Sequence, residues 1–131
     1  MPFTRQTLSV FFIALVAGCS ASPKVESSRT FESPNAELVA TLESVDNGLG
    51  FGLGALYEEV HIGKRNELPS THGEKSPSVA FYIQAAEHPA TSVSVRWLGN
   101  NELEISHHSS IKPGKAVSAL AGVSIKYRVA S

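Results

Sequence analysis

The chain has 131 residues, of which 42% are hydrophobic, and a formal net charge of −1 at pH 7. A nearly neutral chain of this length suffices for one domain and carries no excess of positive charge for binding nucleic acid or anionic headgroups. Its single cysteine, Cys19, excludes an intrachain disulfide bond.

The first predicted element is a signal peptide over residues 1–18. A basic residue, Arg5, precedes an apolar stretch that is about half the ~20 residues needed to span a bilayer. The stretch ends in Val16-Ala17-Gly18-Cys19, which resembles the lipobox of bacterial lipoproteins. The resemblance implies cleavage after Gly18 and lipidation of Cys19, with diacylglycerol on the thiol and an acyl chain on the new amino terminus. The alternative is an ordinary signal peptide that contains a cysteine.

Residues 19–34 are predicted to be a lipidated cysteine followed by a flexible tether. Four serines and a proline fall within residues 20–28, and the segment has too few large apolar side chains to fold alone. Ser20 resembles the outer-membrane sorting signal of Gram-negative lipoproteins, where aspartate would favour the inner membrane. We therefore expect an outer-membrane protein that faces the periplasm and has the membrane, through its lipid anchor, as a partner.

Six short segments within residues 35–131 alternate between apolar and polar side chains. A period of two places one set of side chains on one face of a sheet, and valine, isoleucine and aromatic residues suit such a surface. In chain order, the apolar members are Leu38, Ala40 and Leu42; Val60 and Ile62; Val79, Phe81 and Ile83; Val93, Val95 and Trp97; Leu103 and Ile105; and Val123, Ile125, Tyr127 and Val129.

The connections between these segments contain turn residues. Gly99-Asn100-Asn101 is predicted to be a hairpin link, and residues 68–77 form a long polar loop. Residues 115–121 have the composition of one or two helical turns. We therefore predict a mainly β domain of about six mostly antiparallel strands in a small curled sheet, barrel or sandwich, with one short helix at most.

The segment Glu32–Ala40 resembles the S-P-D-G-x-x-x-A opening of a group of small uncharacterised bacterial lipoproteins, with Asn35-Ala36 in place of Asp-Gly. In that group a Gly-rich link, a strand x-V-x-I/L, then W-x-x-x-x-x-L-x-I and V-x-I-x-Y follow. The group has no assigned activity, so the resemblance implies a lipoprotein and carries over no catalytic residue. The matching residues are Ser33, Pro34 and Ala40; Val60 and Ile62; Trp97, Leu103 and Ile105; and Val123, Ile125 and Tyr127.

Residues 48–54 form a Gly-rich segment in which only Leu49, Phe51 and Leu53 carry side chains. Exposed apolar residues in a loop are costly unless something covers them, so these three are candidates for contact with a partner or an acyl chain. The alternative is a plain flexible link between two strands. A degenerate G-x-G-x-x-A pattern is present, but a dinucleotide site needs a surrounding βαβ unit, which is lacking.

The five histidines offer little for a metal site. His107 and His108 are adjacent and face opposite ways on a strand, while a zinc site needs three or four ligands. His72 with Glu74, or His107 with His108, would bind a metal only weakly. We therefore expect no metal site and no cofactor, and solvated histidines in loops.

Signs of catalysis are weaker still. No serine lies in G-x-S-x-G, no cysteine is free, and Glu58 and Glu59 would face opposite ways on a strand. Glu102 and Glu104 share a face that is predicted to be solvated. Trp97 is predicted to pack in the core with its indole N–H bound to a carbonyl. The chain is therefore not expected to be an enzyme.

The function expected from the sequence is that of a membrane-anchored envelope lipoprotein with a non-enzymatic binding or structural role. Its partner would be an envelope protein or another envelope component, and not nucleic acid. The alternative is a lipoprotein that binds a small ligand in a pocket near the Gly48–Gly54 loop.

Overall fold

The computed structural model describes residues 23–46, 56–67, 69–84 and 93–131, which form nine strands. These ranges contain no helix, and so none that is long and apolar enough to cross a membrane. In chain order the strands are β1 (Lys24–Glu32), β2 (Leu38–Asp46), β3 (Leu56–Lys64), β4 (Val79–Gln84), β5 (Val93–Gly99), β6 (Glu102–His108), β7 (Lys115–Ala116), β8 (Ala119–Leu120) and β9 (Val123–Ala130).

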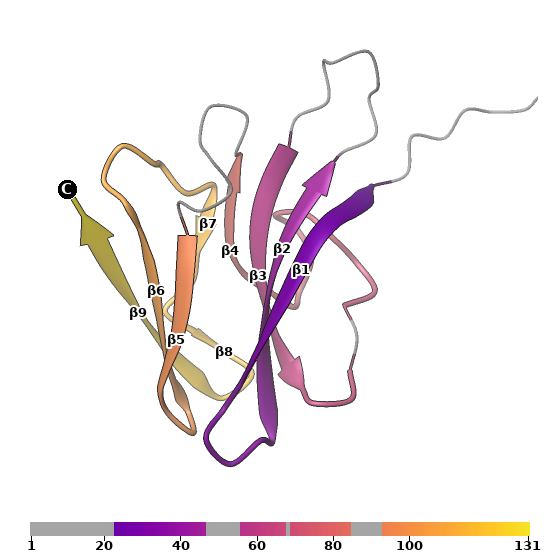
Figure 1. Cartoon of the computed structure of the whole chain (residues 1–131), viewed down its shortest axis with the longest axis vertical. Helices are drawn as coiled ribbons and strands as arrows, with labels where there is room; N and C mark the ends of the chain where they lie inside the picture. Colours follow the sequence, from indigo (N-terminus) through magenta and orange to yellow (C-terminus); the bar gives the residue numbers. More distant parts are fainter. Residues whose placement is uncertain (1–22, 47–55, 68, 85–92) are drawn as a thin grey trace, which may run out of the picture.

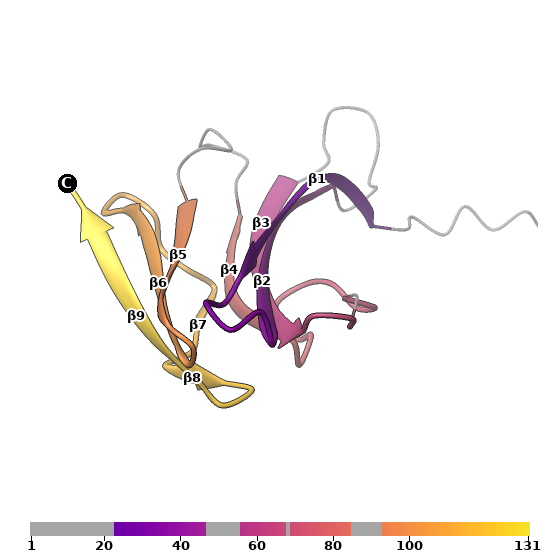
Figure 2. The same ribbon diagram turned by 60° about the horizontal axis from the view of Figure 1, so that its bottom comes forward.

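The strands form two facing sheets that are not closed into a barrel (Figure 1). The first sheet has the order β1-β2-β3-β4-β7 and is antiparallel throughout. The second has the order β5-β6-β9-β8, with β6 and β9 parallel. Figure 2 shows the two sheets splayed like an open sandwich. The predicted fold class, mainly β with mostly antiparallel strands, is confirmed.

All six predicted strands are present, as β2, β3, β4, β5, β6 and β9. Their alternating apolar side chains meet between the two sheets, where burial of apolar surface stabilises the fold by roughly 25 cal/mol per Å². The buried cluster consists of Ala40, Leu42, Val60, Ile62, Ala80, Phe81, Ile83, Val93, Val95, Leu103, Ile105, Ile111, Val123 and Ile125.

Strand β1 lies in the segment that was predicted to be a tether. It pairs with β2 from Lys24↔Asp46 to Glu32↔Val39, so the folded domain includes Lys24–Glu32 and does not begin at residue 35. All its side chains but Phe31 are exposed, which explains why the composition resembled a linker. An edge strand of this kind has no apolar face of its own. Main-chain hydrogen bonds to β2 hold it in the sheet.

Residues 115–121 do not form the predicted helix. They contribute β7, which pairs with β4, and β8, which forms a hairpin with β9. The chain thus leaves β6, crosses to the first sheet at β7 and returns through β8, and this crossover lets β9 run parallel to β6. Ala121 and Gly122, between β8 and β9, both have positive φ angles (52° and 76°), as a type I′ hairpin turn requires.

Trp97 joins the two sheets. Its indole Nε1–H donates a hydrogen bond to the main-chain carbonyl of Phe31 at 2.7 Å, and its ring packs against the apolar cluster. This link connects β5 to β1 across the open side of the sandwich. The predicted role of Trp97 in the core, with its N–H bound to a carbonyl, is confirmed.

Replacing Trp97 with phenylalanine is expected to lower the free energy of unfolding by about 1–3 kcal/mol, because the Phe31 carbonyl loses its donor and the smaller ring fills less space. Urea denaturation followed by circular dichroism measures this, since Trp97 is the only tryptophan. Leu98→Ala, at a side chain 41% exposed, is the control and should change stability by less than about 0.5 kcal/mol. Equal losses of unfolding free energy in the two variants would show that the hydrogen bond from Trp97 to Phe31 does not stabilise the fold.

A candidate metal centre

Four side chains with metal-binding atoms meet on the face of the first sheet that points away from the second sheet. They are Glu43 on β2, Glu59 and His61 on β3, and His72 in the loop between β3 and β4. Glu59 and His61 are two residues apart and therefore share a face. The register sets Glu43 directly opposite Glu59. Strand geometry alone thus brings three of the four side chains together.

The β3–β4 loop, described over residues 65–67 and 69–78, lies on the outer face of the first sheet (Figure 2) and supplies the fourth side chain, His72. Glu43, Glu59 and His61 are 6%, 0% and 2% exposed. The side chain of His72 is 19% exposed and closes the cluster from the solvent side. A face of the sheet that the alternating pattern assigned to solvent is therefore buried.

Glu59 Oε1 is the centre of the hydrogen bonds in the cluster. It accepts one from His61 Nε2 at 2.7 Å and one from His72 Nδ1 at 2.6 Å. Its second oxygen, Oε2, accepts the main-chain N–H of Gly73 at 2.7 Å. Gly73 has a φ of +95°, a conformation that glycine adopts without strain, so a glycine beside His72 lets the loop turn its N–H inward.

Glu43 makes longer contacts with the same two histidines. Its Oε2 lies 3.5 Å from His61 Nε2 and 3.2 Å from His72 Nδ1, and both nitrogens lie closer to Glu59 Oε1. This oxygen is buried and makes no hydrogen bond. An ionised oxygen in that position is costly, and a carboxylate opposite it on the next strand adds repulsion. The two carboxylates therefore share the same two imidazole nitrogens, and Glu59 is the closer of the two.

A second layer of polar groups orients His61. Its Nδ1 shares a hydrogen bond of 2.8 Å with Ser78 Oγ, and Ser78 Oγ lies 3.2 Å from Ser76 Oγ. Ser76 Oγ in turn lies 2.7 Å from Thr71 Oγ1. A histidine that binds a metal commonly has its other ring nitrogen held in this way, which fixes the orientation of the ring.

The charges of the cluster shift the pKa values of its members. Burial lowers the pKa of His61, but the carboxylates of Glu43 and Glu59 outweigh burial and raise that pKa to about 9. Burial raises the pKa of Glu59, but hydrogen bonds from His61, the Gly73 N–H and His72 outweigh it and hold that pKa below its usual value. Glu59 is therefore ionised at neutral pH and His61 carries a proton.

A cleft of about 320 Å³ adjoins the cluster between the sheet and the β3–β4 loop. His61 and Ser78 line it together with hydroxyl groups of the loop, and Thr41, next to His61 on β2, forms part of its floor. Of the four residues of the cluster, His61 lines this cleft.

The structure distributes the predicted site residues differently from the sequence prediction. His72 contacts Glu43 and Glu59 and not Glu74, so the pairing of His72 with Glu74 is wrong. His107 is buried and shares a hydrogen bond with the His108 carbonyl, while His108 is exposed and contacts Ser110, so this pair forms no joint site. Cys19, Leu49, Phe51 and Leu53 lie outside the described residues.

The predicted absence of a metal site overlooked this cluster. A partial signal was present: Glu59-x-His61 on one strand face, with Glu43 on the polar face of the preceding strand. The opposition of Glu43 and Glu59 depends on strand register, and the contribution of His72 depends on the path of the β3–β4 loop.

Comparisons of the chain with protein-family models, with curated protein sequences and with solved structures found no match.

Proposed function

We propose that this protein is an envelope lipoprotein, anchored through Cys19 and facing the periplasm, whose domain binds one divalent transition-metal ion through Glu43, Glu59, His61 and His72. Its role is binding and not catalysis. The anchor and location rest on the lipobox-like Val16–Cys19 and on Ser20. The metal rests on the buried cluster.

The arrangement of the two carboxylates around the two imidazole nitrogens carries the proposal. One ligand atom from each of the four residues lies within 4.8 Å of the other three, and Glu43 Oε2 is buried without a hydrogen bond. Ligands of a tetrahedral zinc ion, with bonds of about 2.0–2.1 Å, are separated by ~3.3 Å. The contacts of Glu43 with the two histidines, at 3.5 and 3.2 Å, already match that separation.

The two contacts of Glu59 with the histidines are shorter, at 2.7 and 2.6 Å, because a hydrogen lies in each. A metal ion would displace these hydrogens and move the nitrogens slightly away from Glu59. It would also supply the positive charge that two opposed carboxylates need.

The donor set favours zinc. Imidazole nitrogens suit zinc and related transition metals, whereas calcium and magnesium prefer all-oxygen sites. Four protein ligands complete a tetrahedron and leave no position for a reacting water, which is the pattern of structural sites. This is the reason to propose binding and not metal catalysis.

The test is zinc binding by the full chain, purified in detergent without a histidine tag. We expect one zinc ion per chain by equilibrium dialysis and elemental analysis. His72→Ala should weaken binding by more than the ~10–100-fold that loss of an outer-layer partner costs, because it removes a ligand.

His108→Ala is the matched control. It removes an exposed histidine that lies outside the cluster, so zinc affinity should not change. Zinc binding that is absent in the wild-type chain, or that responds equally to both substitutions, would contradict the proposed site.

A further inference from the structure

Both sheets have one end at the level of Lys24, where the first strand begins, and the strand pairings define this end. Lys24, the first residue of β1, pairs with Asp46, which pairs with Leu56, the first residue of β3. Tyr57 pairs with the end of β4, and in the second sheet Val93 pairs with His107, which pairs with Val129. We call this end, where β1, β3 and β5 begin and β2, β4, β6 and β9 finish, the anchor end (Figure 1).

The chain between Cys19 and the anchor end is short. Because β1 begins at Lys24, only four residues separate it from Cys19. Even fully extended, this link spans at most about 18 Å. The tether predicted to reach residue 34 would have allowed ~45–50 Å. The strand assignment therefore keeps the anchor end within a short distance of any membrane that holds Cys19.

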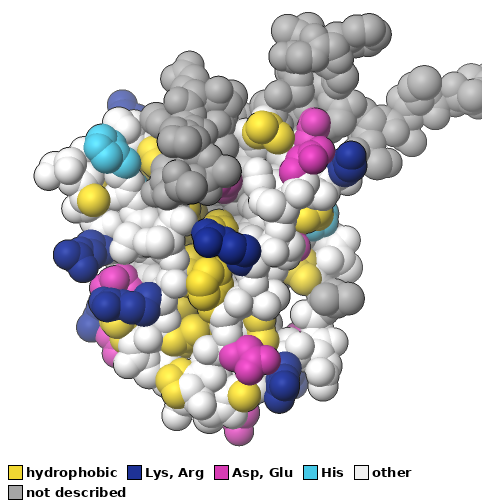
Figure 3. Space-filling view, in the orientation of Figure 1, with side chains coloured by type: hydrophobic (Ala, Val, Ile, Leu, Met, Phe, Trp, Pro, Cys, Tyr) yellow, Lys and Arg dark blue, Asp and Glu magenta, His cyan; other side chains and the backbone are white. Residues whose placement is uncertain are grey.

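Exposed apolar side chains gather at the same end. Among the described residues, the exposed large hydrophobic side chains are Val25, Leu56, Leu98 and Val129. Val25, Leu56 and Val129 belong to the anchor end, and Leu98 lies near the end of β5, at the other end. Figure 3 shows hydrophobic side chains at the upper end, beside acidic and basic ones.

We propose that the anchor end lies against the lipid headgroups of the leaflet that holds Cys19, with Val25 and Leu56 in contact with the bilayer surface. This inference rests on the lipid anchor of the proposed function but not on the metal. A short link removes most of the freedom of the domain to move away, so weak apolar contacts are sufficient to orient it. The metal cluster, on the outer face of the first sheet, would then lie to the side of the membrane contact.

The chain offers a clean labelling experiment. Once Cys19 is lipidated, no other thiol remains, so one introduced cysteine is labelled alone. Leu56→Cys and Leu98→Cys form a matched pair, because the two leucines are 40% and 41% exposed and lie at opposite ends. The neighbouring Trp97 shows where Leu98 lies along the sandwich. Trp97 donates its hydrogen bond to the carbonyl of Phe31, and Phe31 lies about 20 Å along β1 from Lys24.

Each lipidated variant is reconstituted into phosphatidylethanolamine and phosphatidylglycerol vesicles and labelled with an environment-sensitive fluorophore. A nitroxide quencher is carried on the lipid headgroup. We expect the label at position 56 to be quenched about twofold or more relative to the label at position 98, because it lies closer to the headgroups. Val25→Cys, at a residue 38% exposed, should behave like Leu56→Cys and replaces it if that variant does not fold.

Mass spectrometry of Cys19 and sedimentation with the vesicles test the anchor separately. A chain that is not lipidated and does not sediment overturns the anchoring of the proposed function. If the chain is lipidated and sediments, but the labels at positions 56 and 98 are quenched equally, the membrane-facing orientation is wrong and the anchoring stands.

Discussion

Replacing Glu59 with alanine is expected to destabilise the metal-free protein by about 3–5 kcal/mol, the range for removing one partner of a buried ion pair. Glu59 is fully buried and accepts three hydrogen bonds, from His61, His72 and the Gly73 N–H. Without it, the Gly73 N–H loses its acceptor, and His61 and His72 keep only their longer contacts with Glu43, at 3.5 and 3.2 Å. The loop that carries His72 also loses two of its contacts with the sheet.

Urea denaturation in the presence of a chelator, followed through Trp97 fluorescence, measures this loss. Glu43→Ala is the matched control, since Glu43 lies opposite Glu59 at similar burial but its Oε2 accepts no hydrogen bond. It should cost less than Glu59→Ala, because it removes only the longer contacts with His61 and His72, at 3.5 and 3.2 Å. If the two variants lose the same stability, the hydrogen bonds of Glu59 do not hold the loop.

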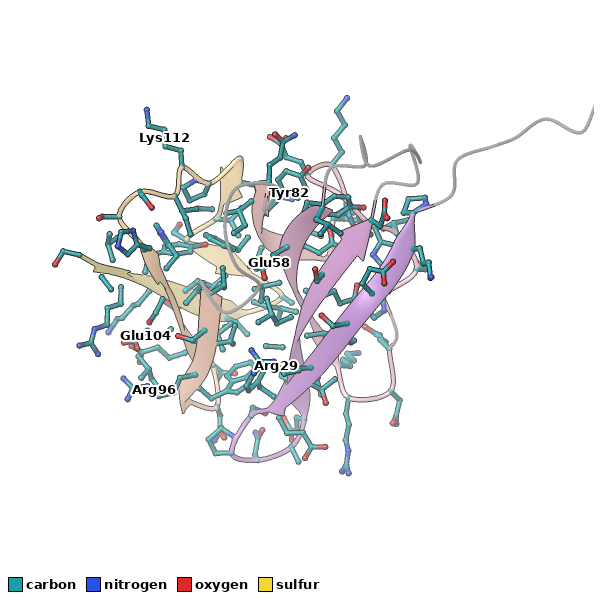
Figure 4. The ribbon with its side chains drawn as sticks, turned by 45° about the horizontal axis from the view of Figure 1, so that its top comes forward. Arg29, Glu58, Tyr82, Arg96, Glu104 and Lys112 are labelled. Atoms are coloured by element: carbon teal, nitrogen blue, oxygen red, sulfur yellow. The ribbon has the colours of Figure 1, made fainter. Side chains whose placement is uncertain are left out.

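Replacing Glu58 with glutamine is expected to stabilise the protein above pH 7 and to leave it nearly unchanged at pH 4.5. Glu58 faces the opposite way from Glu59, toward the second sheet, and is 2% exposed (Figure 4). Its Oε2 has no hydrogen-bond partner. Burial raises the pKa of Glu58 to about 7, and the charge of Arg29 on β1 opposes this only in part.

The sign of the effect follows from linkage between protonation and folding. Well below pH 4.5, Glu58 is neutral in both the folded and the unfolded chain and contributes no pH dependence. Between pH 4.5 and 7 only the unfolded chain ionises, so wild-type stability falls with rising pH. Above pH 7 the full penalty remains, about 3 kcal/mol for a shift of this size. Glutamine cannot ionise, so the Glu58→Gln variant does not carry this penalty.

Thermal and urea denaturation of the wild-type and Glu58→Gln chains at pH 4.5, 6 and 8 measures the difference. Glu58→Leu is a second variant that also removes the unpartnered oxygen, and replacing a buried charge by an apolar side chain of similar size is often stabilising. A pH-independent difference between wild type and Glu58→Gln would show that Glu58 does not titrate in this range.

Much of the fold was predictable because the alternating pattern is a local property. Val60 and Ile62 identify the core face of β3, and the same alternation places Glu59 and His61 together on the other face. The pattern could not show that this other face is covered, because cover comes from a loop with no regular pattern. A buried polar face and a solvated one have the same sequence pattern.

The edge strand and the crossover escaped prediction for a related reason. Strand β1 is held by main-chain hydrogen bonds to β2, and its exposed Ser- and charge-rich side chains carry no strand pattern. The two-residue strands β7 and β8 are too short to show a period, and their pairing partners lie elsewhere in the chain. Pairing of this kind depends on which neighbours the rest of the fold provides.

By itself, the sequence determined six strands and the residues that face the core, since side-chain alternation needs no knowledge of partners. The tertiary structure alone decided that Glu43 lies opposite Glu59 and that the loop brings His72 onto both. It also decided that the first strand begins at Lys24, with only four residues between it and Cys19. These features depend on strand register, loop path and edge pairing, which arise from contacts between residues far apart in the chain.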